Sequence, residues 1–181
     1  WTDPSVRSAE QAGTWAEKAM AYEDNNGIGH AVFGHLLLLD RQFDKAVATC
    51  AEGVKLRESC PLAHGLLGLV LNYCGDPGTS IREVREALRL ERVYPGWLLT
   101  VLAAAYRDSG DVGLSIAAVR ESLRLDPAER DALLVLCSDY QLSGEHEQAK
   151  RLADDIVNRD PRFRLSSFAE RHPYRDAASL D

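Results

Sequence analysis

The side chains most able to carry out chemistry in this sequence are its histidines, cysteines and carboxylates. The five histidines have neither the HExxH spacing of a zinc protease nor an evident serine or cysteine partner for nucleophilic catalysis. They are His30, His35, His64, His146 and His172. No GxGxxG or Walker phosphate-binding loop occurs, because each glycine-containing turn is explained by a helix end. We therefore predict a protein without catalytic residues, cofactor or metal site, and interpret the histidines as structural or surface groups.

The four cysteines follow no metal-binding or redox spacing. Cys50, Cys60, Cys74 and Cys137 form neither a CxxC pair nor a zinc signature, and two of them fall on helix faces that we expect to be buried. The compartment rule for disulfides favours reduced thiols in a cytoplasmic protein. A disulfide framework is the alternative.

Charge and hydropathy argue against two kinds of partner. The 28 acidic residues outnumber the 21 basic ones, which gives a net charge of −7 and disfavours binding to nucleic acid or to an anionic membrane surface. The longest apolar runs, 33–39 and 66–71, are too short to span a bilayer. We therefore expect a cytoplasmic protein with no nucleic-acid or membrane partner.

The elements that must position these side chains repeat with a period of about 34 residues. A large apolar residue followed by a small one recurs in register as Phe33-Gly34, Leu67-Gly68, Leu102-Ala103 and Leu136-Cys137. Helix-ending glycines follow at Gly75, Gly110 and Gly144. A small residue then recurs in the next helix, where two helices would cross closely, as Ala46, Ser80, Ser115 and Ala149. Each repeat is thus a helical hairpin.

This pattern resembles the tetratricopeptide repeat (TPR) over about residues 8 to 163, including aromatic residues at Tyr106 and Tyr140 and prolines at Pro127 and Pro161. The resemblance implies an all-α fold, a right-handed superhelical solenoid of antiparallel helix pairs. We expect residues 1–26 to be a partial unit, its second helix alone, because they match only that half. Four full units are expected at 27–60, 61–95, 96–129 and 130–163, followed by a C-terminal cap or tail at 164–181.

Two units depart from the repeat pattern. The first has residues 40–44 in place of a glycine turn and Glu58 where proline is common, and the second has Pro77-Gly78 at the start of its second helix. We expect these differences to weaken individual turns without breaking the period. In the tail, Phe168 and Tyr174 are the residues expected to pack as a cap.

In a TPR solenoid the first helix of each unit lines the concave surface, and repeat positions 2, 5, 9 and 12 share one face. These positions, with the neighbouring Tyr73, predict a mainly apolar partner groove with Trp97 and Tyr73 as aromatic anchors. The predicted groove residues are Ile28, His35, Leu38, Leu62, Leu69, Asn72, Tyr73, Trp97, Thr100, Arg107, Leu134, Ser138 and Gln141. The same positions also hold Ala31, Gly65, Ala104 and Asp131.

Such a groove suits an amphipathic helix or an extended peptide, so we predict a non-catalytic scaffold that binds a protein or peptide. Packing of the same residues on adjacent units or on the tail, and self-association, are the alternatives. A clamp for a partner's C-terminal carboxylate is not expected, because Arg107 is the one cation at these positions.

A second resemblance concerns 94–97, 164–168 and 172–176, which are similar to TPR regions C-terminal to bacterial class III adenylate or guanylate cyclase domains. It implies a fragment of a larger bacterial signalling protein. It also implies an alternative function as a regulatory or oligomerisation region of a cyclase, with the groove packed intramolecularly. A third hypothesis, an enzyme built on a helical solenoid, requires a polar cluster that this sequence lacks.

Overall fold

The computed structural model describes residues 14, 18, 27–164 and 172–175. These residues form eight helices and no strand. The helices are α2 (Gly27–Leu39), α3 (Phe43–Leu56), α4 (Pro61–Tyr73), α5 (Pro77–Leu90), α6 (Gly96–Asp108), α7 (Val112–Leu125), α8 (Arg130–Leu142) and α9 (His146–Arg159). The expected partial unit at 1–26 lies outside the described residues except for Thr14 and Lys18, and so does Phe168.

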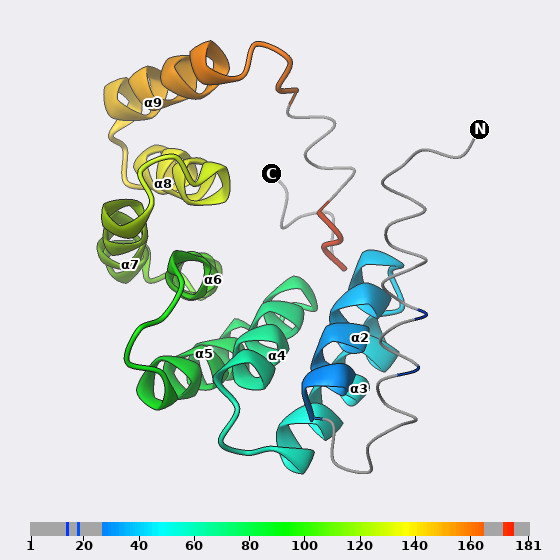
Figure 1. The fold of residues 1–181 in the computed structure, drawn as a ribbon. Helices are drawn as coiled ribbons and strands as arrows, with labels where there is room; N and C mark the ends of the chain where they lie inside the picture. The colour runs from blue at the N-terminus through cyan, green and yellow to red at the C-terminus, as the bar shows by residue number, and fades with distance from the viewer. Residues whose placement is uncertain (1–13, 15–17, 19–26, 165–171, 176–181) are drawn as a thin grey trace, which may run out of the picture.

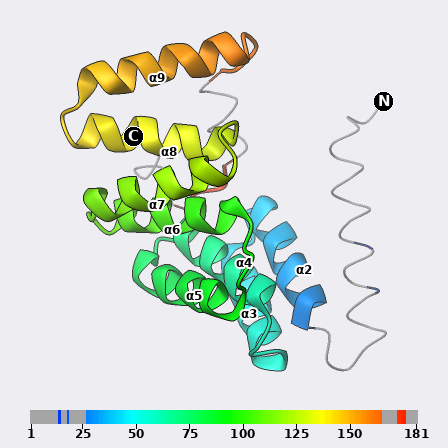
Figure 2. The ribbon, with the colours of Figure 1, turned by 60° about the vertical axis from the view of Figure 1, so that its left-hand side comes forward.

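The helices are arranged as an arc of hairpins (Figures 1 and 2). Helices α2, α4, α6 and α8 lie on the inner side of the arc, and α3, α5, α7 and α9 lie on the outer side (Figure 1). Each first helix also packs on the first helix of the next hairpin. The predicted all-α solenoid of antiparallel helix pairs, a TPR-like superhelix, is therefore confirmed.

Small residues allow the two helices of a hairpin to approach closely. A Cβ atom added to Gly34 would lie 2.3 Å from Cys50 Sγ, and one added to Gly68 would lie 2.5 Å from Val84 Cγ2. Both distances are well inside van der Waals contact, so a larger residue would force the helices apart. The crossing residues predicted from the second helices, Ala46, Ser80, Ser115 and Ala149, are all buried.

The same turn joins the two helices of every hairpin, although only three of the four turns contain glycine. Gly75, Gly110 and Gly144 have left-handed backbones with φ of 85°, 89° and 81°. At the equivalent position of the first hairpin, Arg41 takes φ 57°. Its N–H donates to the Leu38 carbonyl at 2.9 Å, as the N–H of Gly75 does to the Asn72 carbonyl at 3.0 Å. The sequence departure therefore leaves the path of the chain unchanged.

The start of α5 explains the Pro77-Gly78 departure in the second unit. Proline is favoured in the first helical turn because its missing N–H is not needed there. Asp76 caps the same helix by accepting a hydrogen bond from the Thr79 N–H at 3.0 Å. Hydrogen bonds from the side chain and the backbone of Thr79 lower the pKa of Asp76. Pro77 is thus a helix-start signal.

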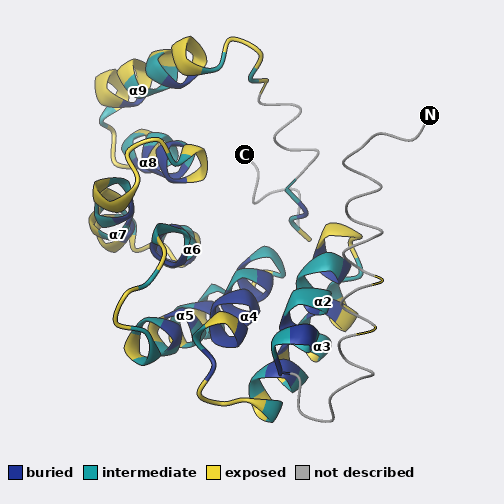
Figure 3. Cartoon of the chain, viewed as in Figure 1, coloured by how far each residue is buried: buried dark blue, intermediate teal, exposed yellow. Residues whose placement is uncertain are grey.

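The core runs along the solenoid between successive helices, as the buried residues in Figure 3 show. Leu38, Val70, Leu98 and Val119 are fully buried or nearly so. Each belongs to a cluster that joins neighbouring helices, so a hairpin is stabilised by the hairpins beside it. Within the described part of the chain, no helix is long and apolar enough to cross a bilayer.

Candidate binding surface on the concave face

The predicted groove residues differ widely in exposure. Leu38 is 0% exposed and packs in the core with Ala46 and Cys50, so its assignment to a partner-contacting surface is wrong. Leu62 is 38% exposed and Gln141 is also exposed. The remaining apolar groove residues of the first, second and fourth units are partly buried, namely Ile28, Leu69 and Leu134.

Thr100, a predicted groove residue, instead anchors the linker between α7 and α8. Its hydroxyl donates to Glu129 Oε2 at 2.7 Å and lies 2.9 Å from Ser122 Oγ. Ser122 donates to the same carboxylate oxygen at 2.8 Å. Since Glu129 immediately precedes α8, this buried network fixes the start of the fourth hairpin to α6 and α7.

Asn72 links α4 to α6. Its amide nitrogen Nδ2 donates to Asp108 Oδ2 at 3.0 Å, and Arg107 Nη2 donates to Asp108 Oδ1 at 2.8 Å. The Arg107 side chain is only 14% exposed. Burial acts to lower the Arg107 pKa, but the Asp108 carboxylate and Tyr174 more than offset this, so the pKa is raised. Arg107 is therefore a paired cation and is not free to clamp a carboxylate.

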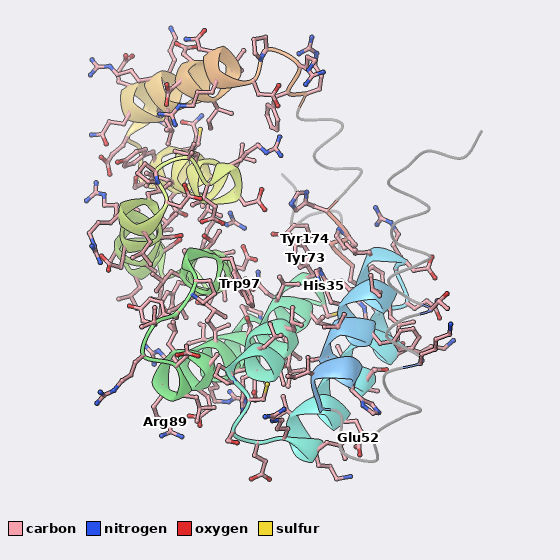
Figure 4. The ribbon with its side chains drawn as sticks, in the orientation of Figure 1. His35, Glu52, Tyr73, Arg89, Trp97 and Tyr174 are labelled. Carbon is pink, nitrogen blue, oxygen red and sulfur yellow. The ribbon has the colours of Figure 1, made fainter. Side chains whose placement is uncertain are left out.

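Tyr73 ends α4 and contacts a segment that is distant in sequence, His172–Arg175 (Figure 4). Its ring centroid lies 4.5 Å from that of Tyr174 and 6.1 Å from that of His172. The Arg175 backbone N–H donates to the Tyr73 carbonyl at 3.0 Å. Burial raises the pKa of both tyrosines. The aromatic pair thus lies inside the arc of helices, beside the C-terminal end of α4.

The same segment also reaches α3. The Arg175 guanidinium forms an ion pair with Asp44 and lies 5.3 Å from the centre of the Phe43 ring, a cation–π arrangement. Pro173 is buried. We call Phe43, Asp44, Tyr73 and Arg107, together with the Tyr73 carbonyl, the aromatic-acidic site.

Trp97 packs between the second and third hairpins. A Cβ atom added to Gly65 would lie 2.8 Å from Trp97 Cη2, which shows how closely the indole covers α4. Trp97 contacts core clusters on both sides of this junction. Its use as an anchor for a partner therefore stays a prediction, with inter-hairpin packing as its observed role.

Several of the side chains first considered for chemistry take part in local contacts. His64 Nδ1 lies 2.7 Å from Glu83 Oε2, and its Nε2 lies 2.8 Å from the Glu58 carbonyl oxygen. His146 Nδ1 lies 2.6 Å from Gln141 Oε1. Desolvation lowers the pKa of the half-buried His35. Ser138, the remaining predicted groove residue, is partly buried on α8.

The four cysteines are free thiols. Burial raises the pKa of Cys50 to about 12, so this thiol is a packing residue beneath Gly34. Among the residues that the structure describes, no group of three or more histidine, cysteine or acidic side chains could hold a metal ion.

Sequence reasoning missed two members of the aromatic-acidic site, Phe43 and Asp44. They stand at the start of a second helix, where the repeat pattern predicts no ligand contact. The available signals were Tyr174, which was expected to pack as a cap, and the departure from the repeat at 40–44, and neither indicated that the tail contacts α3.

The fold is that of solved TPR proteins. The crystal structure of PilW, described as a widely conserved type IV pilus biogenesis factor, matches with a TM-score of 0.77 at 19% identity over 92% of this chain and 76% of PilW. YrrB, described as a TPR protein with an unusual peptide-binding site, matches with a TM-score of 0.65 at 16% identity over 92% of this chain and 85% of YrrB. MamA 41-end from Desulfovibrio magneticus RS-1 matches with a TM-score of 0.68 at 18% identity over 83% of this chain and 85% of the MamA chain.

No protein-family model matches the sequence, and no curated protein matches it. Identities of 16 to 19% establish the shared fold alone.

Proposed function

We propose that this chain is a non-catalytic, TPR-like scaffold that binds a protein or peptide segment on the concave face formed by α2, α4, α6 and α8. The observation that carries the proposal is the placement of His172–Arg175 against this face. That segment contacts Tyr73 of α4 through a ring pair and a main-chain hydrogen bond, and it forms an ion pair with Asp44 at the start of α3. These are the interactions by which scaffolds hold extended peptides.

The partly exposed residues of the inner helices extend this surface beyond the segment. Leu62, Leu69 and Leu134 offer apolar area on α4 and α8, and Gln141 offers a polar group near the end of α8. The description of YrrB as a TPR protein with a peptide-binding site supports the same use of the fold. We place the scaffold in a bacterial cytoplasm, as part of a larger signalling protein.

The alternative is a regulatory or oligomerisation region of a class III nucleotidyl cyclase, with the groove packed within the chain. The contact between Tyr73 and Tyr174 favours the intramolecular part of this alternative. Its cyclase part rests on the sequence resemblance alone. The two functions differ in whether an external segment binds the concave face.

A selection of displayed random peptides on the immobilised wild-type chain tests the proposal. Selected peptides are then titrated against a Leu62→Ala, Leu134→Ala double variant, in which two inner helices each lose apolar surface. The matched control is Leu114→Ala, Leu125→Ala, because these leucines are 49% and 44% exposed on α7, an outer helix. Trp97 is left unchanged, since it packs between hairpins.

We expect the concave double variant to bind at least ~10-fold more weakly, because two apolar contacts of ~1 kcal/mol each are removed. The outer-face control is expected to bind like the wild type. Circular dichroism establishes that all three proteins are equally helical. Equal binding by both variants would contradict the proposed surface.

A further inference from the structure

The aromatic-acidic site is assembled from helices that are distant along the chain. Tyr73 comes from α4, Phe43 and Asp44 from α3, and Arg107 from α6. The partner of Asp44, Arg175, lies 131 residues away in sequence. Because these groups come from separate helices, the site is a surface formed by the fold. Its side chains determine which segment it binds.

The site has a separate subsite for each of two consecutive residues of the bound segment. An aromatic ring packs on Tyr73 at 4.5 Å between centroids, with its hydroxyl beside the Arg107 guanidinium. The next residue places a guanidinium over Phe43 and against Asp44. The order of the two places therefore selects a tyrosine followed by an arginine.

The main chain of the bound segment is also recognised. Tyr73 is the last residue of α4, and the carbonyls of a helix's last turn have no partner within the helix. The Arg175 N–H supplies that partner at 3.0 Å. This hydrogen bond attaches the main chain of the segment to the helix end and does not depend on side-chain identity.

The charge of the site favours a basic occupant. Among the described residues, the carboxylates of Asp108 and Asp131 and the guanidinium of Arg107 act electrostatically on both Tyr73 and Tyr174. Asp44 adds a further carboxylate whose side chain is 93% exposed. Carboxylates thus outnumber the cation, so an acidic segment would be repelled and a basic one attracted.

The resident segment is held by contacts that are weak one at a time. The Arg175–Asp44 ion pair is exposed at both ends, with side-chain exposures of 43% and 93%, and such pairs stabilise little. A tethered segment competes at an effective concentration in the millimolar range. A free peptide with the same two residues and additional contacts can therefore replace it.

We propose that the aromatic-acidic site binds a partner segment carrying a tyrosine followed by an arginine, and that His172–Arg175 is the resident occupant which such a partner displaces. This inference rests on the proposed function and names the partner chemistry of one part of the concave face. It assigns Tyr73 as the ring contact, Asp44 and Phe43 as the basic place, and the Tyr73 carbonyl as the main-chain acceptor.

The test uses the whole chain with its resident segment disabled by Tyr174→Ala and Arg175→Ala. A fluorescent peptide of sequence 171–176 is titrated against this variant and against the wild type, with anisotropy as the readout. We expect saturable binding to the disabled variant and at least ~10-fold weaker binding to the wild type, whose own segment competes. Unchanged circular dichroism establishes that the variant is folded.

Charge reversal separates recognition from loss of fold. In the disabled variant, Asp44→Lys is expected to abolish binding of the peptide and to restore binding of a peptide carrying Arg175→Glu. The matched control is Glu52→Lys, because Glu52 is an exposed carboxylate on the same helix and is placed far from Tyr73 in Figure 4. That control is expected to leave the affinity unchanged.

Four results would overturn the inference. The first is no saturable binding to the folded, disabled variant up to millimolar peptide, and the second is equal binding to the wild type and the disabled variant. The third is a wild-type dimer in sedimentation that becomes monomeric in the disabled variant, which would assign the site to a second copy of the chain. If peptides selected on the concave face lack the tyrosine-arginine pair, this inference fails while the proposed function stands.

Discussion

The second hairpin and the fourth bury different amounts of their first helices. Helix α4 has nine buried residues, whereas α8 has five. One of those five is a carboxylate, Asp139, whose side chain accepts a hydrogen bond from Ser115 at 2.6 Å. In α9, the last described helix, only Ala149 and Ile156 are buried.

The difference follows from position in the solenoid. Helix α4 packs on α2, α3, α5 and α6, so both of its sides are covered. Helix α9 has no described hairpin beyond it. A hairpin with one neighbour has less interface to stabilise it, and solenoids open from their less stable ends. The aromatic-acidic site is thus built on the best-packed helix, where the Tyr73 carbonyl and ring are held firmly.

The largest expected effect comes from filling the tight crossing of the second hairpin. Gly68→Val would push new atoms into Val84, which is fully buried and stiff because it is β-branched. We expect a loss of ~3 kcal/mol in the free energy of unfolding. The corresponding change in the fourth hairpin, Cys137→Val, adds only about one methyl group at a half-buried position and is expected to cost ~1 kcal/mol or less.

Urea unfolding followed by circular dichroism measures both variants. Equal losses of unfolding free energy in the two variants would contradict the proposed difference in packing between the second and fourth hairpins. A larger loss for Cys137→Val than for Gly68→Val would reverse it.

The buried carboxylate of the fourth hairpin gives a pH-dependent effect. Burial raises the pKa of Asp139 to about 6, although the Ser115 hydrogen bond opposes the shift. A folded-state pKa above the unfolded value means that this group favours the folded state at low pH and loses that contribution as pH rises through about 6. Asp139→Asn removes the titrating group while keeping an acceptor for Ser115.

We expect Asp139→Asn to become more stable relative to the wild type by ~1.5 kcal/mol as pH is raised from about 5 to about 8. Urea unfolding of both proteins at each pH gives this difference directly. A difference that stays constant with pH, or that shrinks, would show that Asp139 does not titrate as a buried group.

A smaller effect concerns the linker that attaches the fourth hairpin to the third. Glu129 accepts hydrogen bonds from the hydroxyls of Thr100 and Ser122. Glu129→Ala leaves both hydroxyls without this acceptor and is expected to cost ~1 kcal/mol. Amide hydrogen exchange should report faster opening in α8 and α9 than in α4 and α5. Uniform acceleration along the whole chain would argue that the hairpins unfold together.

The smallest expected effect is at Arg41, where the first hairpin makes the left-handed turn without glycine. Arg41→Gly removes the Cβ strain at φ 57° and is expected to stabilise by ~0.5 kcal/mol, part of the gain being offset by the greater freedom of glycine in the unfolded chain. The control is Gly75→Arg, which is expected to destabilise. A loss of stability on Arg41→Gly would show that the arginine side chain contributes more than its backbone strain costs.

The hairpin framework could be predicted from the sequence because a repeat shows each contact several times. Gly34 and Gly68 follow large apolar residues in register, and the structure places both where the helices cross. Gly75, Gly110 and Gly144 likewise marked the turns. Such residues can be recognised in a single sequence because the same packing constraint acts on every unit.

The binding surface could be predicted only in part, since its members come from different units. The repeat positions placed Leu38 on the surface, but it is fully buried in a core cluster with residues of α3 and α4. Tyr73 and Tyr174 are separated in sequence by α5 to α9, and no spacing rule connects residues that far apart. Asp139 stood in a buried register position that the sequence analysis did not single out, although a charge there is the strongest local conflict in the fourth hairpin.

Residue-level mapping by NMR is the most direct test of the concave face as the working surface. A peptide selected on the wild-type chain is titrated into labelled protein, and backbone and side-chain shifts are followed. Binding on the concave face predicts changes concentrated at inner-helix residues such as Leu69, Tyr73 and Arg107, with the Tyr174 ring signal moving as its contact is lost. Changes confined to α3, α5, α7 and α9, with Tyr73 and Tyr174 unaffected, would contradict it.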